Sequence, residues 1–365
     1  MKRSMLSLAV MLAASCSHAA DINVSGFGSL MFTKNPFESR YMEYRSGSGF
    51  DGSRFGVMAT AIINSKLTLS SQLLNKTTSE GRDTDFRWAM LDYKFADKVH
   101  VRIGKLPLTS RAISDINFTS EWNNEPAEFF DQTPFRSMEG VELRYNTNVG
   151  VGRALAFELS HGSASANMNF SYIYPGFIAQ AEADNLIVAS ATMFTADSKV
   201  RVSYAQGDAV FSVSENMQMK MMLAEANGFD FAAAYDSQGA KIKNYTATFE
   251  QEVGRTMHLK GGITLAESNH PSLTDQFGYY ITATKSFDNW QLHYTIGHQK
   301  EKLEGSWDST QYSQKLGLSY ELSGTSNIRV EATQIDSKNS INDNFLLRPQ
   351  PDKGVMSSVA YNFVF

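Results

Sequence analysis

Apolar and polar residues alternate along most of the chain with a period of two. In residues 98–104, Val99, Val101 and Ile103 share one face, and polar or small residues occupy the positions between them. This alternation is typical of a β-strand with one apolar and one polar face. Sixteen segments follow the pattern and are predicted to be strands. They are residues 22–32, 54–63, 66–74, 86–95, 98–104, 140–146, 153–161, 186–194, 199–204, 229–235, 243–252, 277–287, 290–297, 313–322, 327–333 and 355–365.

The connections between these segments are of two kinds. Short ones, such as 64–65, 96–97 and 288–289, separate connections as long as 35–53 and 106–139. Short turns at one end and long loops at the other are typical of a membrane β-barrel. All eight prolines lie in connections, as expected if every strand is paired on both sides and every backbone N–H is needed. The sequence therefore predicts an all-β, transmembrane antiparallel β-barrel.

The number of strands is left open by two further apolar segments, 216–226 and 257–266. Residues 217–225 follow Ser214 as a helix cap and favour a short helix in a loop. Both chain ends are expected on the periplasmic side, so the strand count must be even and the two segments enter or leave together. We expect sixteen strands, with eighteen as the alternative.

Aromatic residues support the barrel over the core of a soluble β-sandwich. They gather beside the short turns, as expected for a girdle at the membrane interface. The last strand carries Val355, Val359, Tyr361, Phe363 and Phe365 on one face and ends on an aromatic residue. In a barrel this strand closes the ring by pairing with residues 22–32. The terminal aromatics Tyr361, Phe363 and Phe365 also resemble the signal by which outer-membrane proteins are recognised for assembly.

Composition agrees with a barrel that is apolar outside and polar inside. The chain is 42% hydrophobic, 12% aromatic and only 19% charged, yet its mean hydropathy is −0.29. No mature stretch approaches the ~20 apolar residues of a membrane helix, which excludes a helical membrane protein. The balance of 38 acidic against 33 basic residues makes nucleic acid an unexpected partner.

The N-terminus has the pattern of a secretory signal peptide. A basic start, an apolar segment from Met5 to Ala14, and small residues at 17 and 19 predict cleavage after Ala19. Residues 1–19 are then the signal peptide and 20–365 a single barrel domain in the bacterial outer membrane. Cys16, the only cysteine, leaves with the signal peptide, although an acylated Cys16 is an alternative. The mature chain then has no disulfides.

Three short motifs resemble the Gram-negative outer-membrane porins. Residues 53–56 (SRFG) look like the start of their second strand, and 142–146 (ELRYN) like the strand after their constriction loop. Residues 125–131 (EPAEFFD) look like the acidic tip of that loop, but depart from it where Phe129 and Phe130 replace the usual pair of glycines.

The resemblance implies a channel whose third external loop, 106–139, folds into the pore. Its acidic residues then face arginines on the barrel wall, and the charges across the constriction select solutes by size and charge. Strand parity also places the three wall arginines on the polar face. The expected constriction residues are Glu121, Glu125, Glu128 and Asp131 of the loop and Arg54, Arg102 and Arg144 of the wall. The family further implies a homotrimer.

The predicted function is passive diffusion of small hydrophilic solutes and ions through a water-filled channel. A solute-specific channel and a loop-based adhesin or receptor on the same scaffold are the alternatives. The partners are expected to be these solutes, outer-membrane lipid and the assembly machinery. The seven dispersed histidines indicate no catalytic or metal site, so we expect no enzyme activity, cofactor or metal.

Overall fold

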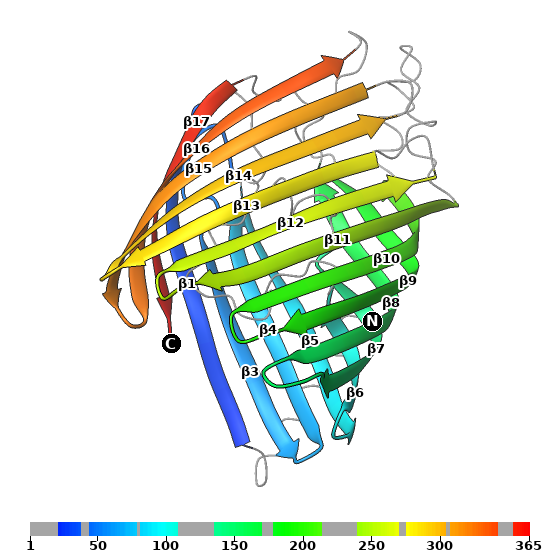
Figure 1. Ribbon diagram of the computed structural model, residues 1–365. Helices are drawn as coiled ribbons and strands as arrows, with labels where there is room; N and C mark the ends of the chain where they lie inside the picture. The colour runs from blue at the N-terminus through cyan, green and yellow to red at the C-terminus, as the bar shows by residue number, and fades with distance from the viewer. Residues whose placement is uncertain are drawn as a thin grey trace.

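The structure is a computed structural model that describes residues 21–37, 44–78, 81–108, 135–169, 178–213, 239–269, 275–303, 307–341 and 353–365. In this part of the chain, seventeen strands form one antiparallel sheet (Figure 1). They are β1 (Asp21–Asn35), β2 (Gly47–Gly49), β3 (Arg54–Asn64), β4 (Leu67–Thr78), β5 (Gly81–Ala96), β6 (Val99–Pro107), β7 (Ser137–Asn148), β8 (Ala154–Asn169), β9 (Ile178–Phe194), β10 (Ser198–Val213), β11 (Ala240–Val253), β12 (Met257–Ser268), β13 (Asp275–Phe287), β14 (Trp290–Leu303), β15 (Trp307–Ser323), β16 (Ser326–Ile341) and β17 (Lys353–Val364).

The sheet closes into a ring of sixteen strands. β1 pairs with β3 on one side and with β17 on the other, so it has no free edge along most of its length. β2 is the extra strand, a short segment that pairs with residues 33–35 of β1 beyond the end of β3. Closure satisfies the backbone hydrogen bonds of the edge strands, as a membrane span requires. The predicted sixteen-stranded barrel is confirmed.

One strand of the ring is a segment that the sequence analysis had placed outside the sixteen. The structure forms β12 from Met257–Ser268, which the sequence left as an alternative outside the sixteen. The predicted strand 229–235 and the alternative 216–226 both lie outside the described residues. Because β10 pairs directly with β11, the ring closes without either of them.

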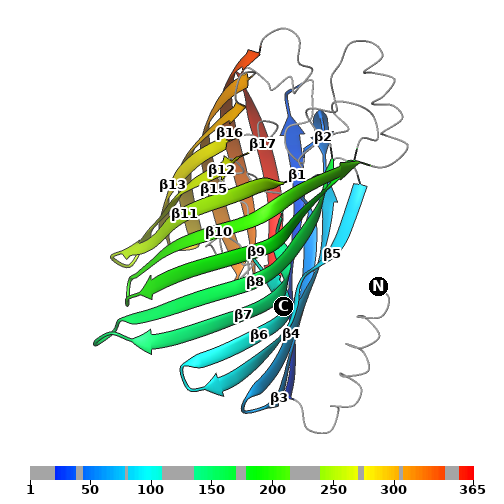
Figure 2. The same ribbon diagram turned by 90° about the vertical axis from the view of Figure 1, so that its right-hand side faces the viewer.

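The strands meet in short turns at one end of the barrel. At this end, two residues separate β3 from β4, β5 from β6, β13 from β14, and β15 from β16. Figure 2 shows turns of this kind along its lower left edge. The strands themselves extend further toward the other end than predicted, since β8 continues to Asn169 and β9 begins at Ile178.

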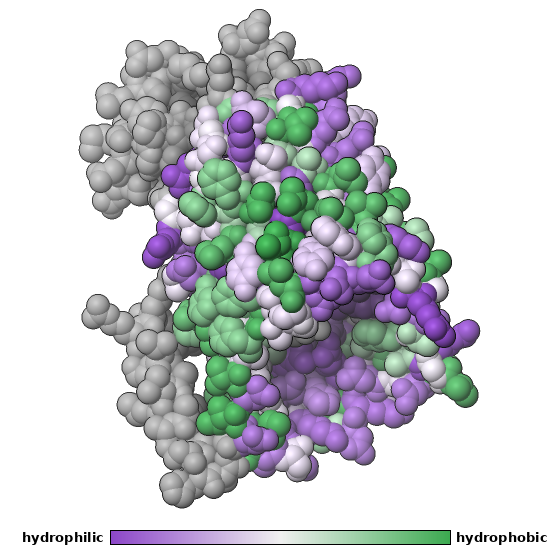
Figure 3. All heavy atoms as spheres, turned by 90° about the vertical axis from the view of Figure 1, so that its left-hand side faces the viewer, coloured by the Kyte–Doolittle hydropathy of each residue, from purple (hydrophilic) through white to green (hydrophobic). Residues whose placement is uncertain are grey.

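The outer face of the barrel is apolar. Residues such as Val24, Val202 and Leu316 point outward and are more than half exposed, and their sequence neighbours point into the barrel. Figure 3 shows apolar side chains across much of the outer surface and hydrophilic ones gathered in a hollow. The period-two pattern is thereby confirmed: one face of the strands points out of the barrel and the other points into it.

Part of the inner wall is apolar, which the alternation did not predict. We call this cluster of buried, inward-facing residues the inner apolar band. It includes Phe27, Leu74, Trp88, Met90, Leu106, Leu108, Phe135, Met138, Ala181, Ala183, Leu186 and Val188. Ala181, Ala183 and Val188 have no exposed surface, so other parts of the chain cover this side of the wall.

Aromatic rings lie across the seam between the first and last strands. Tyr361 and Phe363 lie on the outward face of β17, and Phe365, the residue after the strand, continues this row of stacked rings and is 60% exposed. A Cβ at Gly26 or Gly28 of β1 would clash with the rings of Phe365 and Phe363. The two glycines therefore leave the room that lets these rings lie across the seam.

Candidate functional site

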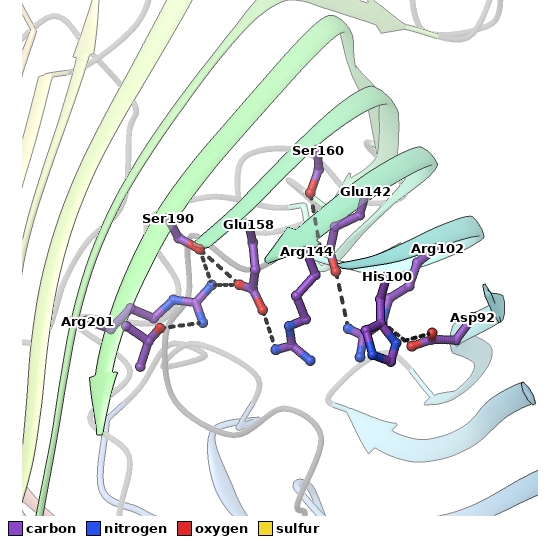
Figure 4. A network of polar contacts seen from close by, with 10 residues as sticks. Asp92, His100, Arg102, Glu142, Arg144, Glu158, Ser160, Ser190 and Arg201 are labelled. Carbon is purple, nitrogen blue, oxygen red and sulfur yellow. Dashed lines mark hydrogen bonds and ion pairs between the residues drawn. The ribbon is translucent and has the colours of Figure 1, made fainter. Parts of the chain in front are cut away.

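Seven charged or titratable side chains form a band across the inner face of six neighbouring strands, β5 to β10 (Figure 4). We call them the charged row. Its members are Asp92, His100, Arg102, Glu142, Arg144, Glu158 and Arg201. Strand parity places them inward, because outward residues such as Ile103 and Leu143 lie between them. Short turns follow β5 and precede β10. Asp92 lies four residues before the end of β5, and Arg201 lies three residues after the start of β10. The row therefore lies nearer the end of the barrel with the short turns.

The first part of the row is centred on Arg102. Its Nε donates to Asp92 Oδ2 at 2.7 Å, and its Nη1 lies 3.2 Å from Glu142 Oε1. His100 Nδ1 is 2.9 Å from the other oxygen of Asp92. The Ser160 hydroxyl donates to Glu142 Oε2 at 3.2 Å. Arg102 therefore joins the carboxylates of the two strands that flank its own.

The second part of the row is centred on Glu158. Arg144 donates to one oxygen of this carboxylate, and Arg201 Nη2 donates to the other at 2.6 Å. Ser190 donates to the same oxygen as Arg201 at 2.9 Å. The Glu158 side chain is only 2% exposed, whereas that of Arg144 is 25% exposed. Glu158 is thus a buried anion shared by two cations, and one of them reaches the lumen.

The charges of the row balance. Three arginines stand against three carboxylates, and each arginine bonds to a carboxylate on a neighbouring or nearby strand of the wall. Charge-assisted hydrogen bonds of this kind are short and directional. The row is therefore a chain of alternating charges along the wall, and its net charge is zero when His100 is neutral.

The predicted constriction residues are only partly brought together. Arg102 and Arg144 lie in the charged row. Arg54 faces inward opposite Ser29, but at the far end of the barrel from the short turns, where its Nε donates to Gly52 O at 2.9 Å. The predicted loop residues Glu121, Glu125, Glu128 and Asp131 lie outside the described residues.

Sequence reasoning missed the wall carboxylates. Glu142 and Glu158 lie on the polar faces of predicted strands, so parity already placed them inward, and Glu142 is two residues from Arg144 on the same strand. Asp92 shares its face with Trp88 and Met90, so the alternation gave no direction for it. Which arginine each carboxylate contacts depends on the stagger between strands, and this stagger cannot be read from the sequence of a single strand.

A second polar group lies on the wall formed by β14 to β16. His293 Nε2 is 2.8 Å from Glu331 Oε1, and both side chains are buried. The two residues sit on strands separated by β15, and Gly317 lies between them. A Cβ there would clash with the imidazole and would lie 3.0 Å from Glu331 Cγ. His298 faces the other way, where it stacks on Tyr279 with ring centroids 5.1 Å apart.

Among the described residues, no group of three or more His, Cys, Asp or Glu side chains is arranged to hold a metal ion. No helix in the same part of the chain is long and apolar enough to cross a membrane.

A closed sixteen-stranded barrel, apolar outside and lined with charged and hydroxyl side chains within, defines a channel of the outer membrane. The chain belongs to the Gram-negative porin family, whose sequence model matches residues 7–340. Family membership indicates a channel rather than an enzyme. No curated protein matches the sequence.

Solved structures share the fold at low sequence identity. A loop-deletion mutant of OmpT, an outer membrane protein of Vibrio cholerae, is 12% identical with a TM-score of 0.60, covering 95% of this chain and 100% of that one. The anion-selective porin from Comamonas acidovorans is 12% identical with a TM-score of 0.58, at the same two coverages. The outer membrane channel DcaP of Acinetobacter baumannii is 12% identical with a TM-score of 0.56 and covers 95% of this chain and 98% of that one.

Proposed function

We propose that this porin allows small hydrophilic solutes and ions to diffuse passively, and that it selects them by size and charge inside the barrel. The charged row is the observation that carries charge selection. Its arginines and carboxylates face the lumen from five strands, β5 to β8 and β10, and Arg144 is partly exposed there. Fixed charges along a narrow passage change the energy of every ion that passes.

We also propose that the third loop, 106–139, folds into the barrel and narrows it. Its central residues lie outside the described part of the chain, so the support comes from its two ends. Leu108 and Phe135 are each 5% exposed and belong to the inner apolar band. The N–H of Leu108 donates to Arg136 O at 3.2 Å, which holds the two ends together. An apolar inner wall is stable only when covered, and this loop begins and ends on it.

The test is ion selectivity in a planar bilayer. Substituting Arg54→Gln and Arg144→Gln together removes two inward positive charges, so we expect the reversal potential in a KCl gradient to shift toward cations. Lys243→Gln is the matched control, because Lys243 shares the outward face of its strand with Tyr245. An unchanged reversal potential in a double variant that still conducts would contradict charge selection by these residues.

The remaining proposals concern export and assembly. Residues 1–19 act as a cleaved signal peptide, and Tyr361, Phe363 and Phe365 form the C-terminal signal for the outer-membrane assembly machinery. A homotrimer is supported by a similar structure of OmpT described as a trimer form. The apolar outer face of the barrel meets lipid wherever it does not meet another subunit.

A further inference from the structure

The described parts of the first long connection of the barrel, between β1 and β3, are residues 36–37 and 44–53, and they are bonded to the wall. We call them the entrance strap. The strap lies at the end of the barrel opposite the short turns. It includes β2, which continues the sheet beside the upper part of β1.

The strap is closed by an ion pair within it. Arg45 Nη2 lies 2.7 Å from Asp51 Oδ1, Arg45 Nε lies 2.8 Å from Oδ2, and the backbone N–H of Arg45 also donates to Oδ2 at 2.8 Å. The Asp51 side chain is 2% exposed. Burial raises the pKa of this carboxyl, but the hydrogen bonds and charge of Arg45 outweigh burial and hold the pKa below its ordinary value. Asp51 is therefore ionised, and the ion pair intact, at neutral pH.

Hydrogen bonds to the flanking strands fix the two ends of the strap. Asn35 Oδ1 accepts the N–H of Phe37 at 3.1 Å, and Asn35 Nδ2 donates to Arg45 O at 3.1 Å. At the other end, the N–H of Gly52 donates to Thr77 O at 2.7 Å. The Ser53 hydroxyl accepts the N–H of Met31 at 2.9 Å. Bonds at both ends and across the middle make the strap a fixed part of the wall.

The ring of Phe37 lies on the inner side of that wall. It packs with Ile335 and Met356, which face inward on β16 and β17, and it is 7% exposed. A Cβ at Gly354 would clash with this ring. Gly354 faces inward, because its neighbour Val355 faces outward and is 56% exposed. Phe37 therefore fills the place of the missing Gly354 side chain and adds a second layer inside the barrel.

A second phenylalanine of the strap lies on the opposite side. Phe50 is 61% exposed, and its ring centroid is 5.5 Å from that of Phe32, which faces outward on β1. The strap therefore passes over the rim with one aromatic ring inside the barrel and one outside.

We propose that the entrance strap is a fixed size filter at the outer mouth, in series with the charged row. By thickening the wall over β1, β16 and β17, it narrows the opening on that side and excludes larger hydrophilic solutes before they reach the row. Pore width is a direct determinant of which solutes pass. The ligands concerned are uncharged oligosaccharides, whose passage depends on width and not on charge.

The test compares the swelling rates of liposomes that contain the full-length channel, with arabinose, sucrose and raffinose as probes. In Phe37→Ala the rate for raffinose relative to arabinose should rise by about twofold, because the inner layer loses its ring. Asp51→Asn, which removes the ion pair of the strap, should change the ratio in the same direction. Phe50→Ala is the matched control and should leave the ratio unchanged, since that ring lies outside the barrel.

Folding is monitored by heat-modifiable migration on gels, and an open channel by conductance. If Phe37→Ala and Asp51→Asn both fold and conduct but keep the wild-type ratio, the strap is not a size filter. An equal rise in the Phe50→Ala control would also overturn the proposal, because it would trace the effect to the loop in general. The proposal rests on the proposed channel function, and wild-type protein that admits none of the three probes would count against that function itself.

Discussion

Replacing Glu158 by Gln tests whether the wall carboxylates set the charge selectivity of the channel. The substitution keeps the shape of the side chain, removes one negative charge and replaces one of the two acceptor oxygens by an NH2 donor. Glu158 bonds to Arg144 and Arg201, so the variant leaves two arginines sharing an uncharged partner. The charged row then carries three positive charges against two negative ones.

The expected size of the effect follows from Coulomb's law. An ion that passes about 5 Å from the altered site in water experiences about 0.8 kcal/mol from one unit charge, and salt screening reduces this to about 0.5 kcal/mol. Anions gain this energy and cations lose it, so the difference between them changes by about 1 kcal/mol. The chloride-to-potassium permeability ratio should therefore rise by about fivefold in Glu158→Gln.

The assay is the reversal potential of single channels in a KCl gradient, repeated at high salt, where screening should shrink the effect. Glu182→Gln is the control. Glu182 lies on β9 between the inward-facing Ala181 and Ala183, so its carboxylate points away from the lumen. A conducting Glu158→Gln channel with wild-type selectivity, or an equal shift in Glu182→Gln, would refute the assignment of selectivity to the row.

Two further predictions concern packing and pH. Gly317→Ala should lower the free energy of unfolding by about 1–3 kcal/mol, because its Cβ would clash with the ring of His293, which contacts Glu331. Unfolding in denaturant measures this change. Gly324→Ala is the control, because a Cβ there meets open space, and an equal loss of stability in this variant would contradict the prediction. Because the pKa of Asp51 is lowered in the folded protein, its pairing with Arg45 is complete above about pH 4 and is lost as the pH falls through the lowered value. The difference in thermal midpoint between wild type and Asp51→Asn should therefore be constant from neutral pH to about pH 5 and should disappear only in strong acid. A difference that vanishes near neutral pH would contradict this prediction.

The sequence was informative about the barrel because each strand has one face in lipid and one in water. That contrast repeats every two residues and can be read without knowing the partner strands. It failed for β12, where Gly261 and Gly262 interrupt the alternation. A Cβ at Gly261 would lie 2.6 Å from the ring of Phe249 on β11, so the neighbouring strand requires the glycine. A reason of this kind is invisible within a single segment.

The inner apolar band was missed for a related reason. In residues 186–189, apolar side chains occupy both faces of the strand, so the alternation gives no direction. In the structure, Leu186 and Val188 face inward and are buried, whereas Ile187 faces outward and is 45% exposed. A strand that is covered on both faces reads as a continuous apolar run. Such a run in a barrel sequence therefore marks a part of the wall that is buried on its inner side.

The positions of the row and the strap determine how the two selections combine. The row belongs to β5 through β10 and lies toward the short turns, whereas the strap contacts β1, β16 and β17 at the other end. They share no residue, and the charges of the row are largely cancelled within a few ångströms by their own partners. Fields from paired charges weaken faster with distance than those of single charges, and salt screens them further. Under the two proposals, a solute entering from outside meets a restriction of width first and a balanced set of charges later. We therefore expect Phe37→Ala to alter size exclusion and leave the charge preference unchanged, and Glu158→Gln to do the reverse.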